Sequence, residues 1–188
     1  MSFLTLRRFN NVLSAVVIVL SLYVLLMPFL PQVSYRWQKM PPLAQAIENN
    51  PETVPQQNTL VIPKMKLQQT IHEGKNKWTL NEGVWHIPKT GSPDAGGNMV
   101  LSGHRFTYGG PAVFYHMDLL KEGDDIVIYW QQKKHRYRVE HVLVVPPSAK
   151  GLVDQTPDEM LTIYTCTPLV TAKNRLIIQA KPIPEVTP

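Results

Sequence analysis

Cysteine is almost absent from this chain of 188 residues, in which Cys166 is the only one. A single cysteine excludes an intrachain disulfide and the CxxC pairs of structural zinc sites. The sequence also lacks an HExxH motif. We therefore expect no metal site and no cofactor, and an exported lone thiol stands out as a candidate functional group.

A large excess of charge of one sign is also missing. The formal net charge is +5, and part of it lies in the pair Arg7 and Arg8 and in the basic segment 133–138. Such a small and scattered surplus is typical of a solvated surface with a membrane-flanking pair. We therefore predict no nucleic-acid partner.

One long apolar run is present, from Val12 to Leu30, and it contains no charged residue. At about 1.5 Å per residue it spans close to the ~30 Å core of a bilayer. Arg7 and Arg8 before it favour a cytoplasmic N-terminus and an external C-terminus. A cleaved signal peptide is the alternative, but the small-x-small site at 44–46 lies well past the run, which exceeds the usual signal length of about 7–15 residues.

We therefore expect residues 1–34 to form a cytoplasmic tip and a single-pass anchor in the cytoplasmic membrane, with lipid contact through residues 12–30. Residues 35–58 are rich in Pro, Gln and Asn and predict an extracytoplasmic linker with at most a helical turn around 43–47. The proline-rich segment 182–188 predicts a loose tail.

Residues 59–181 consist of short apolar runs broken by Gly, Pro and Asn, which predicts an all-β barrel or sandwich. We expect a hairpin turn at 132–134, a short helix within 112–119 and a helical turn at 156–160. The predicted strands are Thr59–Ile62, Met65–Ile71, Asn98–Ser102, Asp125–Gln131, His135–Val145, Leu161–Tyr164 and Arg175–Ala180.

Cys166 follows the apolar strand 161–164, and Arg175 opens the next strand nine residues later. If the two strands pair as a hairpin, the two residues flank its loop at about 4.5–5.5 Å between Cα atoms. A nearby cation favours the nucleophilic thiolate, and a guanidinium also binds an oxyanion. Arginine cannot act as a general base, so the site needs a histidine.

Three of the six histidines are candidates for that base. His104 follows the strand 98–102 and a glycine, His86 lies beside a loop, and His116 lies in the possible short helix. Spacing alone leaves the choice among them open, with His104 favoured because site residues collect at strand ends.

The arrangement of these residues resembles the sortase family. The motif Thr165-Cys166-Thr167-Pro168 with Arg175, and Gly103-His104-Arg105 after Gly97-Asn98, match the sortase signature in order and spacing. The other matching segments are Leu60–Pro63, the stretch from Gly83 through Pro88 to Gly91, and Leu120–Asp124.

This resemblance implies a closed eight-stranded sortase-type barrel over residues 59–181 and a triad of His104, Cys166 and Arg175. It implies cleavage of an LPxTG-type sorting signal between Thr and Gly through a Cys166 thioester. The implied partners are surface proteins that carry this signal and an amine acceptor from a peptidoglycan precursor or a pilin lysine.

Segments 104–111 and 171–175 most resemble class E sortases, which attach proteins to the wall and can prefer LAxTG. Tyr108 is the implied specificity residue, and Thr165 is a candidate for holding the substrate oxyanion. A pilin-polymerising class C enzyme is the alternative within the family, although neither an Asp-Pro-aromatic lid motif nor a second apolar span is present.

Two functions outside the sortase family are the alternatives. An L,D-transpeptidase places its cysteine a few residues after a Ser/His-Gly pair, whereas Ser102-Gly103 here precedes Cys166 by more than sixty residues. A non-catalytic, membrane-tethered β-barrel that serves as a binding module would have an inert Cys166, without pH-dependent labelling near neutrality.

Overall fold

The computed structural model describes residues 3–27, 30–49, 54–93, 95–149, 151 and 154–184. The chain divides into two compact units, 1–38 and 39–188, and each is described by itself.

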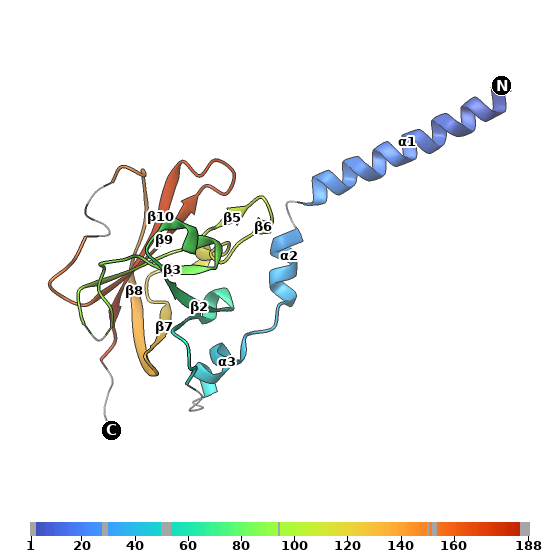
Figure 1. Ribbon diagram of the computed structural model, residues 1–188. Helices are drawn as coiled ribbons and strands as arrows, with labels where there is room; N and C mark the ends of the chain where they lie inside the picture. Colours follow the sequence, from blue (N-terminus) through green and yellow to red (C-terminus); the bar gives the residue numbers. More distant parts are fainter. Residues whose placement is uncertain are drawn as a thin grey trace. The chain divides into compact units, whose positions relative to one another are not determined.

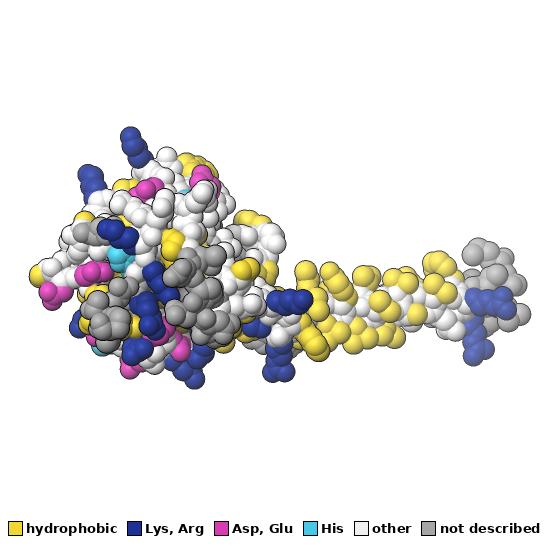
Figure 2. Space-filling view, turned by 90° about the horizontal axis from the view of Figure 1, so that it is seen from below, with side chains coloured by type: hydrophobic (Ala, Val, Ile, Leu, Met, Phe, Trp, Pro, Cys, Tyr) yellow, Lys and Arg dark blue, Asp and Glu magenta, His cyan; other side chains and the backbone are white. Residues whose placement is uncertain are grey.

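The N-terminal unit contains α1 (Phe3–Leu26) and α2 (Leu30–Trp37). Within α1, the segment Arg7–Leu26 is long and apolar enough to cross a membrane. Hydrophobic side chains cover this helix, with basic side chains at its N-terminal end (Figure 2). Residues 28 and 29 of the predicted apolar run lie outside the described residues. A single apolar helix near the N-terminus fits the predicted anchor.

The second unit is built on a closed barrel with the strand order β1-β2-β3-β4-β9-β10-β8-β7 (Figure 1). The predicted eight-stranded all-β fold is therefore confirmed. Its strands are β1 (Thr59–Ile62), β2 (Leu67–Glu73), β3 (Val84–His86), β4 (Asn98–Ser102), β7 (Asp125–Trp130), β8 (Lys133–Val145), β9 (Met160–Thr167) and β10 (Asn174–Pro182).

Short elements connect the strands. A two-stranded hairpin, β5 (Phe106–Thr107) with β6 (Gly110–Pro111), follows β4. Three 3₁₀ helices, which are η2 (Pro63–Met65), η3 (Lys77–Asn81) and η4 (Met117–Leu119), complete the described elements. The η4 helix lies within the short helix predicted for 112–119.

Alternation along each strand forms the barrel core. In β9, Leu161 and Ile163 belong to the interior cluster, and in β10 Leu176 and Ile178 do the same. Because successive strand residues point to opposite faces, the residues between them face outward. This parity decides which side chains can reach the candidate site.

The predicted linker contains a helix that packs on the barrel. In α3 (Pro42–Asn49), Leu43 and Ala44 are buried against Val61, Val127 and Tyr129. The Leu43 amide also donates to the Gln68 side chain at 3.2 Å. The middle of the 35–58 segment thus forms part of an outer layer of the barrel. Residues 50–53 lie outside the described residues.

Three local predictions are wrong. The β7–β8 turn is formed by Gln131 and Gln132, one residue earlier than expected, because both adopt the positive φ that a tight two-residue hairpin needs. No helical turn forms at 156–160, because residues 157 and 158 form a bend and Met160 begins β9. Residues 182 and 183 of the predicted tail are held to the barrel, since the Ile183 amide donates to the Arg136 carbonyl at 2.8 Å. Residues 185–188 lie outside the described residues.

Candidate active site

The predicted β9–β10 hairpin places Cys166 directly opposite Arg175. The two are register partners in the antiparallel ladder, so their side chains emerge on the same face of the sheet. Because Leu161 and Ile163 in β9 point into the barrel, Cys166 has the parity of the outer face. The thiol and the guanidinium therefore share the outer surface at one end of the barrel.

His104 is brought to the same place by the neighbouring strand. β4 runs parallel to β9, with Ser102 opposite Tyr164, so two more positions along each chain bring His104 level with Cys166. Met99 and Leu101 face the core, which gives His104 the outward parity. Cys166 on β9 and Arg175 on β10 thus lie on neighbouring strands, and His104 follows the end of β4, the strand on the other side of β9.

All three side chains are partly exposed, as a site open to a substrate requires. Cys166 is a free, half-buried cysteine, and His104 and Arg175 have intermediate exposure. Within the described ranges, no group of three His, Cys, Asp or Glu side chains could hold a metal ion. The chemistry on offer is therefore that of a thiol, an imidazole and a guanidinium.

The Arg175 guanidinium is anchored to its own loop. Its Nη1 donates to the carbonyls of Ala172 at 3.2 Å and Asn174 at 3.1 Å. No bond from Nε or Nη2 is found among the described residues, so those N–H groups remain for a ligand oxygen. An arginine held on one side and open on the other is suited to bind a carbonyl or oxyanion.

Thr165 does not present its hydroxyl to the outer face. The residue is buried, and its Oγ1 donates to the Gly103 carbonyl at 2.7 Å. Any contact of Thr165 with a substrate would therefore have to come from its backbone. The Thr165 hydroxyl instead connects β9 to the segment that carries His104.

Gly103 permits close packing just before His104. A Cβ on this residue would come within 2.7 Å of the Phe114 ring and of a Val113 methyl. The Phe114 amide donates to the His104 carbonyl at 3.0 Å. The backbone before and at His104 is thus packed and hydrogen-bonded against the segment that follows β6.

Tyr108 lies at the tip of the β5–β6 hairpin, four residues after His104 in the chain, and its side chain is fully exposed. The specificity role implied for it by the family resemblance stays a prediction.

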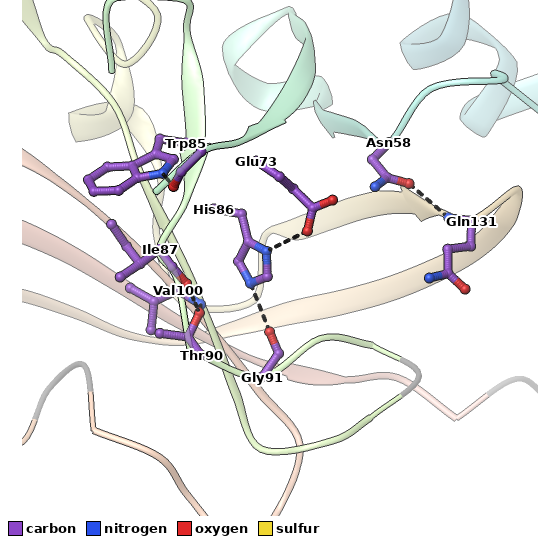
Figure 3. A network of polar contacts seen from close by, with 10 residues as sticks. Asn58, Glu73, Trp85, His86, Ile87, Thr90, Gly91, Val100 and Gln131 are labelled. Atoms are coloured by element: carbon purple, nitrogen blue, oxygen red, sulfur yellow. Dashed lines mark hydrogen bonds and ion pairs between the residues drawn. The ribbon is translucent and has the colours of Figure 1, made fainter. Parts of the chain in front are cut away.

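The other two candidate bases are engaged elsewhere. In Figure 3, His86 faces Glu73 through Nδ1 at 3.4 Å and donates from Nε2 to the Gly91 carbonyl at 2.9 Å. Both ring nitrogens are therefore occupied by acceptors, and the ring also packs edge-on against Trp130. This arrangement is structural.

His116 precedes η4 and is not on a strand that adjoins β9. Burial, and to a smaller extent the Arg105 charge, lowers the pKa of His116, although Asp118 acts in the opposite direction. The topology therefore favours His104, which neighbours Cys166, over His116.

A hollow of about 490 Å³ is lined by residues next in the chain to each of the three predicted catalytic residues, which are Arg105, Thr167 and Leu176. Its apolar wall includes Val144, Val170 and Leu176, and its polar wall includes Arg105, Asp118 and Thr167. No role was predicted for Arg105 or Thr167 from the sequence. Their positions directly after His104 and Cys166 are the sequence feature that points to them.

The sequence has relatives of known name. A family model described as "Sortase domain" matches residues 60–183. The chain is 37% identical over 142 residues to Sortase SrtE1 of Streptomyces coelicolor, a match that covers 67% of this chain and 40% of that protein. It is 31% identical over 135 residues to Sortase D of Bacillus subtilis, with coverage of 70% and 66%. The chain thus spans less than half of the first relative and about two thirds of the second.

Solved structures share the fold. "Sortase C1 of GBS Pilus Island 1" has a TM-score of 0.63 and 28% identity, with coverage of 71% of this chain and 67% of that chain. Sortase A from Corynebacterium diphtheriae has a TM-score of 0.62 and 27% identity, with coverage of 70% and 62%.

Proposed function

Because this chain belongs to the sortase family, we propose that it is a membrane-anchored cysteine transpeptidase. It cleaves an LPxTG- or LAxTG-type sorting signal between Thr and Gly and transfers the protein to a cell-wall amine. The observation that carries this proposal is the register that sets Arg175 opposite Cys166, with His104 just past the end of β4, which pairs with β9.

In the first step, the Cys166 thiolate attacks the carbonyl carbon of the scissile Thr–Gly bond. Arg175 donates through its remaining N–H groups to the oxygen that becomes negatively charged. The C–N bond then breaks, and His104, as imidazolium, gives its proton to the departing glycine amine. The product is a thioester between Cys166 and the threonine carbonyl.

In the second step, an acceptor amine attacks the thioester carbonyl. His104, now a neutral imidazole, removes a proton from the attacking nitrogen, and the C–S bond breaks to release the Cys166 thiolate. A new amide forms, so the bond energy of the first peptide is retained through the thioester. Arg175 again binds the oxygen of the tetrahedral intermediate.

The site faces outside the cell in this proposal. α1 crosses the cytoplasmic membrane, with residues 12–30 in lipid, and Arg7 and Arg8 stay on the cytoplasmic side. Sorting signals and wall precursors meet on the outer surface, where the catalytic unit 39–188 would lie. The partners are proteins that carry the signal, an amine of a peptidoglycan precursor, and the bilayer.

The class E assignment is a finer proposal. Its support is the 37% identity with Sortase SrtE1 and the exposed Tyr108 in the hairpin after His104. A pilin-polymerising activity is the second candidate, because a sortase of a pilus island shares the fold at a TM-score of 0.63. The two differ in the acceptor, a wall-precursor amine or a pilin lysine.

The test uses the full chain in detergent with LPxTG and LAxTG peptides and two acceptors, triglycine and a lysine-containing pilin-type peptide. We expect transfer to triglycine with a preference for LAxTG. Replacing Tyr108 with alanine should reduce that preference by about tenfold, the scale of one lost side-chain contact in a specificity site. Product ratios from chromatography measure both effects.

Trp78, an exposed aromatic residue on η3, supplies the matched control. Trp78→Ala should leave the LAxTG to LPxTG ratio unchanged. Equal use of the two peptides by the native chain would remove the class E proposal, and exclusive transfer to the lysine peptide would favour the pilin-type activity. The absence of product with every pair would contradict the transpeptidase itself.

A further inference from the structure

The backbone pairing between β4 and β9 stops before it reaches the catalytic positions. Its last pair is Ser102 with Tyr164, while His104 and Cys166 lie two positions further. The β4–β9 ladder therefore does not itself fix the distance between the imidazole and the thiol, which depends on other contacts.

Two side-chain bonds replace the ladder at this point. The Thr165 hydroxyl donates to the Gly103 carbonyl at 2.7 Å, just before the catalytic pair. The Arg105 guanidinium donates from Nη1 to the Thr167 hydroxyl at 2.8 Å, just after it. Both bonds join residues that are 62 apart in sequence, so they enclose His104 and Cys166 from both sides.

The Arg105 side chain is itself held in one orientation. It is 7% exposed, and its Nη2 lies 2.9 Å from a carboxylate oxygen of Asp118. Its Nε donates to the Tyr115 carbonyl at 3.3 Å. A buried cation with an ion pair and two further acceptors cannot reorient without losing several bonds at once. The planar guanidinium fork reaches all three directions, which a lysine ammonium on its flexible stem would not reproduce.

Arg105 cannot touch the reacting bond from this position. Thr167 follows Cys166 along β9, so its side chain points to the opposite face from the thiol, and the Arg105 guanidinium is engaged by Thr167, Asp118 and Tyr115. Their effect on chemistry would have to pass through the backbone of the adjacent residues. That geometry is the one expected of a residue that positions others.

We propose that Arg105, through its bond to Thr167, is a positioning residue that holds His104 at the reactive distance from Cys166. This inference rests on the proposed function, because it assigns Arg105 a role in the same proton transfer. A misplacement of about 1 Å between reacting groups is enough to cost up to a hundredfold in rate. Loss of the link should therefore lower kcat and leave the peptide KM almost unchanged.

The first test removes only the acceptor of this bond. Thr167→Val keeps the shape of the side chain and leaves the Arg105–Asp118 ion pair intact. We expect kcat for transfer to fall by about tenfold, with KM changed less than about twofold. Thr167→Ser restores a hydroxyl and should recover most of the lost rate. A change in KM with kcat unaffected would overturn the proposal. Failure of Thr167→Ser to recover the lost kcat would also overturn it.

The second test replaces Arg105 with methionine and compares it with Arg138→Met. Arg138 also pairs with an aspartate, Asp125 at 2.9 Å, but it lies on β8 and is exposed. Arg105→Met should lower kcat at least as much as Thr167→Val, whereas Arg138→Met should leave it unchanged. Thermal unfolding of each variant shows whether it is folded. If Arg105→Met does not fold, Thr167→Val still tests the proposal.

A third measurement needs no sorting peptide. Iodoacetamide alkylates Cys166 as the sulfur displaces iodide and His104 takes the thiol proton. Thr167→Val should slow this reaction near neutral pH by about threefold or more, but it should have no further effect in a His104→Ala background, since both changes act through one contact.

Equal slowing in both backgrounds would contradict the positioning role, because the effect would not pass through His104. If the native chain transfers no peptide at all, the proposed function fails, and the alkylation cycle still decides whether Arg105 and Thr167 position His104. The two failures are therefore distinguishable.

Discussion

Replacement of His104 with alanine is expected to lower kcat/KM for transfer by about 10²–10⁴, the range of a lost general acid–base. The reason is that each step moves a proton between His104 and an amine, once to the glycine that leaves and once from the acceptor. Water would have to supply or remove that proton at neutral pH. The measurement is steady-state transfer from the preferred peptide, with the full chain in detergent.

His141→Ala is the matched control for this prediction. His141 is an exposed histidine on the β8 strand and pairs with Gln179 of β10, so its loss should leave the rate unchanged. A second comparison, His86→Ala, tests stability more than chemistry because His86 is bonded to Glu73 and Gly91. Near-native transfer by the His104 variant would show that another group moves the proton.

Arg175→Ala is expected to lower kcat by about 10²–10³, the effect of a lost oxyanion donor. Arg175 lies opposite Cys166 in the ladder, and its Nη1 is bonded to the carbonyls of Ala172 and Asn174, so its other N–H groups would donate to the oxyanion in the proposed mechanism. Arg175→Lys keeps the charge but loses the planar fork. We expect the lysine variant to remain at least about tenfold below the native kcat.

Two rates, Cys166 alkylation and peptide transfer, distinguish whether Arg175 acts on the thiolate or on the oxyanion. If its charge chiefly favours the thiolate, Arg175→Lys restores Cys166 alkylation by iodoacetamide together with peptide transfer. If it chiefly binds the oxyanion, the lysine variant is alkylated at the native rate but transfers slowly. The second pattern is the one expected here, and recovery of both rates by lysine would contradict it.

The alternation of apolar and polar residues, together with the residues typical of turns, was sufficient to predict most of the barrel strands. Asn98–Ser102 and Thr59–Ile62 have the predicted bounds, because each is a β-rich run flanked by Gly, Pro or Asn. The pairing of Cys166 with Arg175 followed from the short loop between their strands. The choice of His104 did not, because the parallel partnership of β4 and β9 joins segments more than sixty residues apart.

The missed elements are those whose formation depends on distant contacts. β3 is only three residues long and is defined by its partners β2 and β4. α3 is stabilised by burial of Leu43 and Ala44 on the outside of the barrel, and a short proline-flanked segment gives little local sign of that. No role was predicted for Arg105, since the burial of its guanidinium depends on the distant Asp118 and Thr167.

The most direct test of the account is the covalent intermediate on Cys166. The full chain is incubated with the preferred peptide without an amine acceptor, and its intact mass is measured before and after hydroxylamine. We expect a mass increase equal to the acyl fragment that ends in threonine, located on the peptide that contains Cys166. Hydroxylamine should remove this adduct, and Cys166→Ala should not form it. An adduct on another residue, or transfer product from Cys166→Ala, would contradict it.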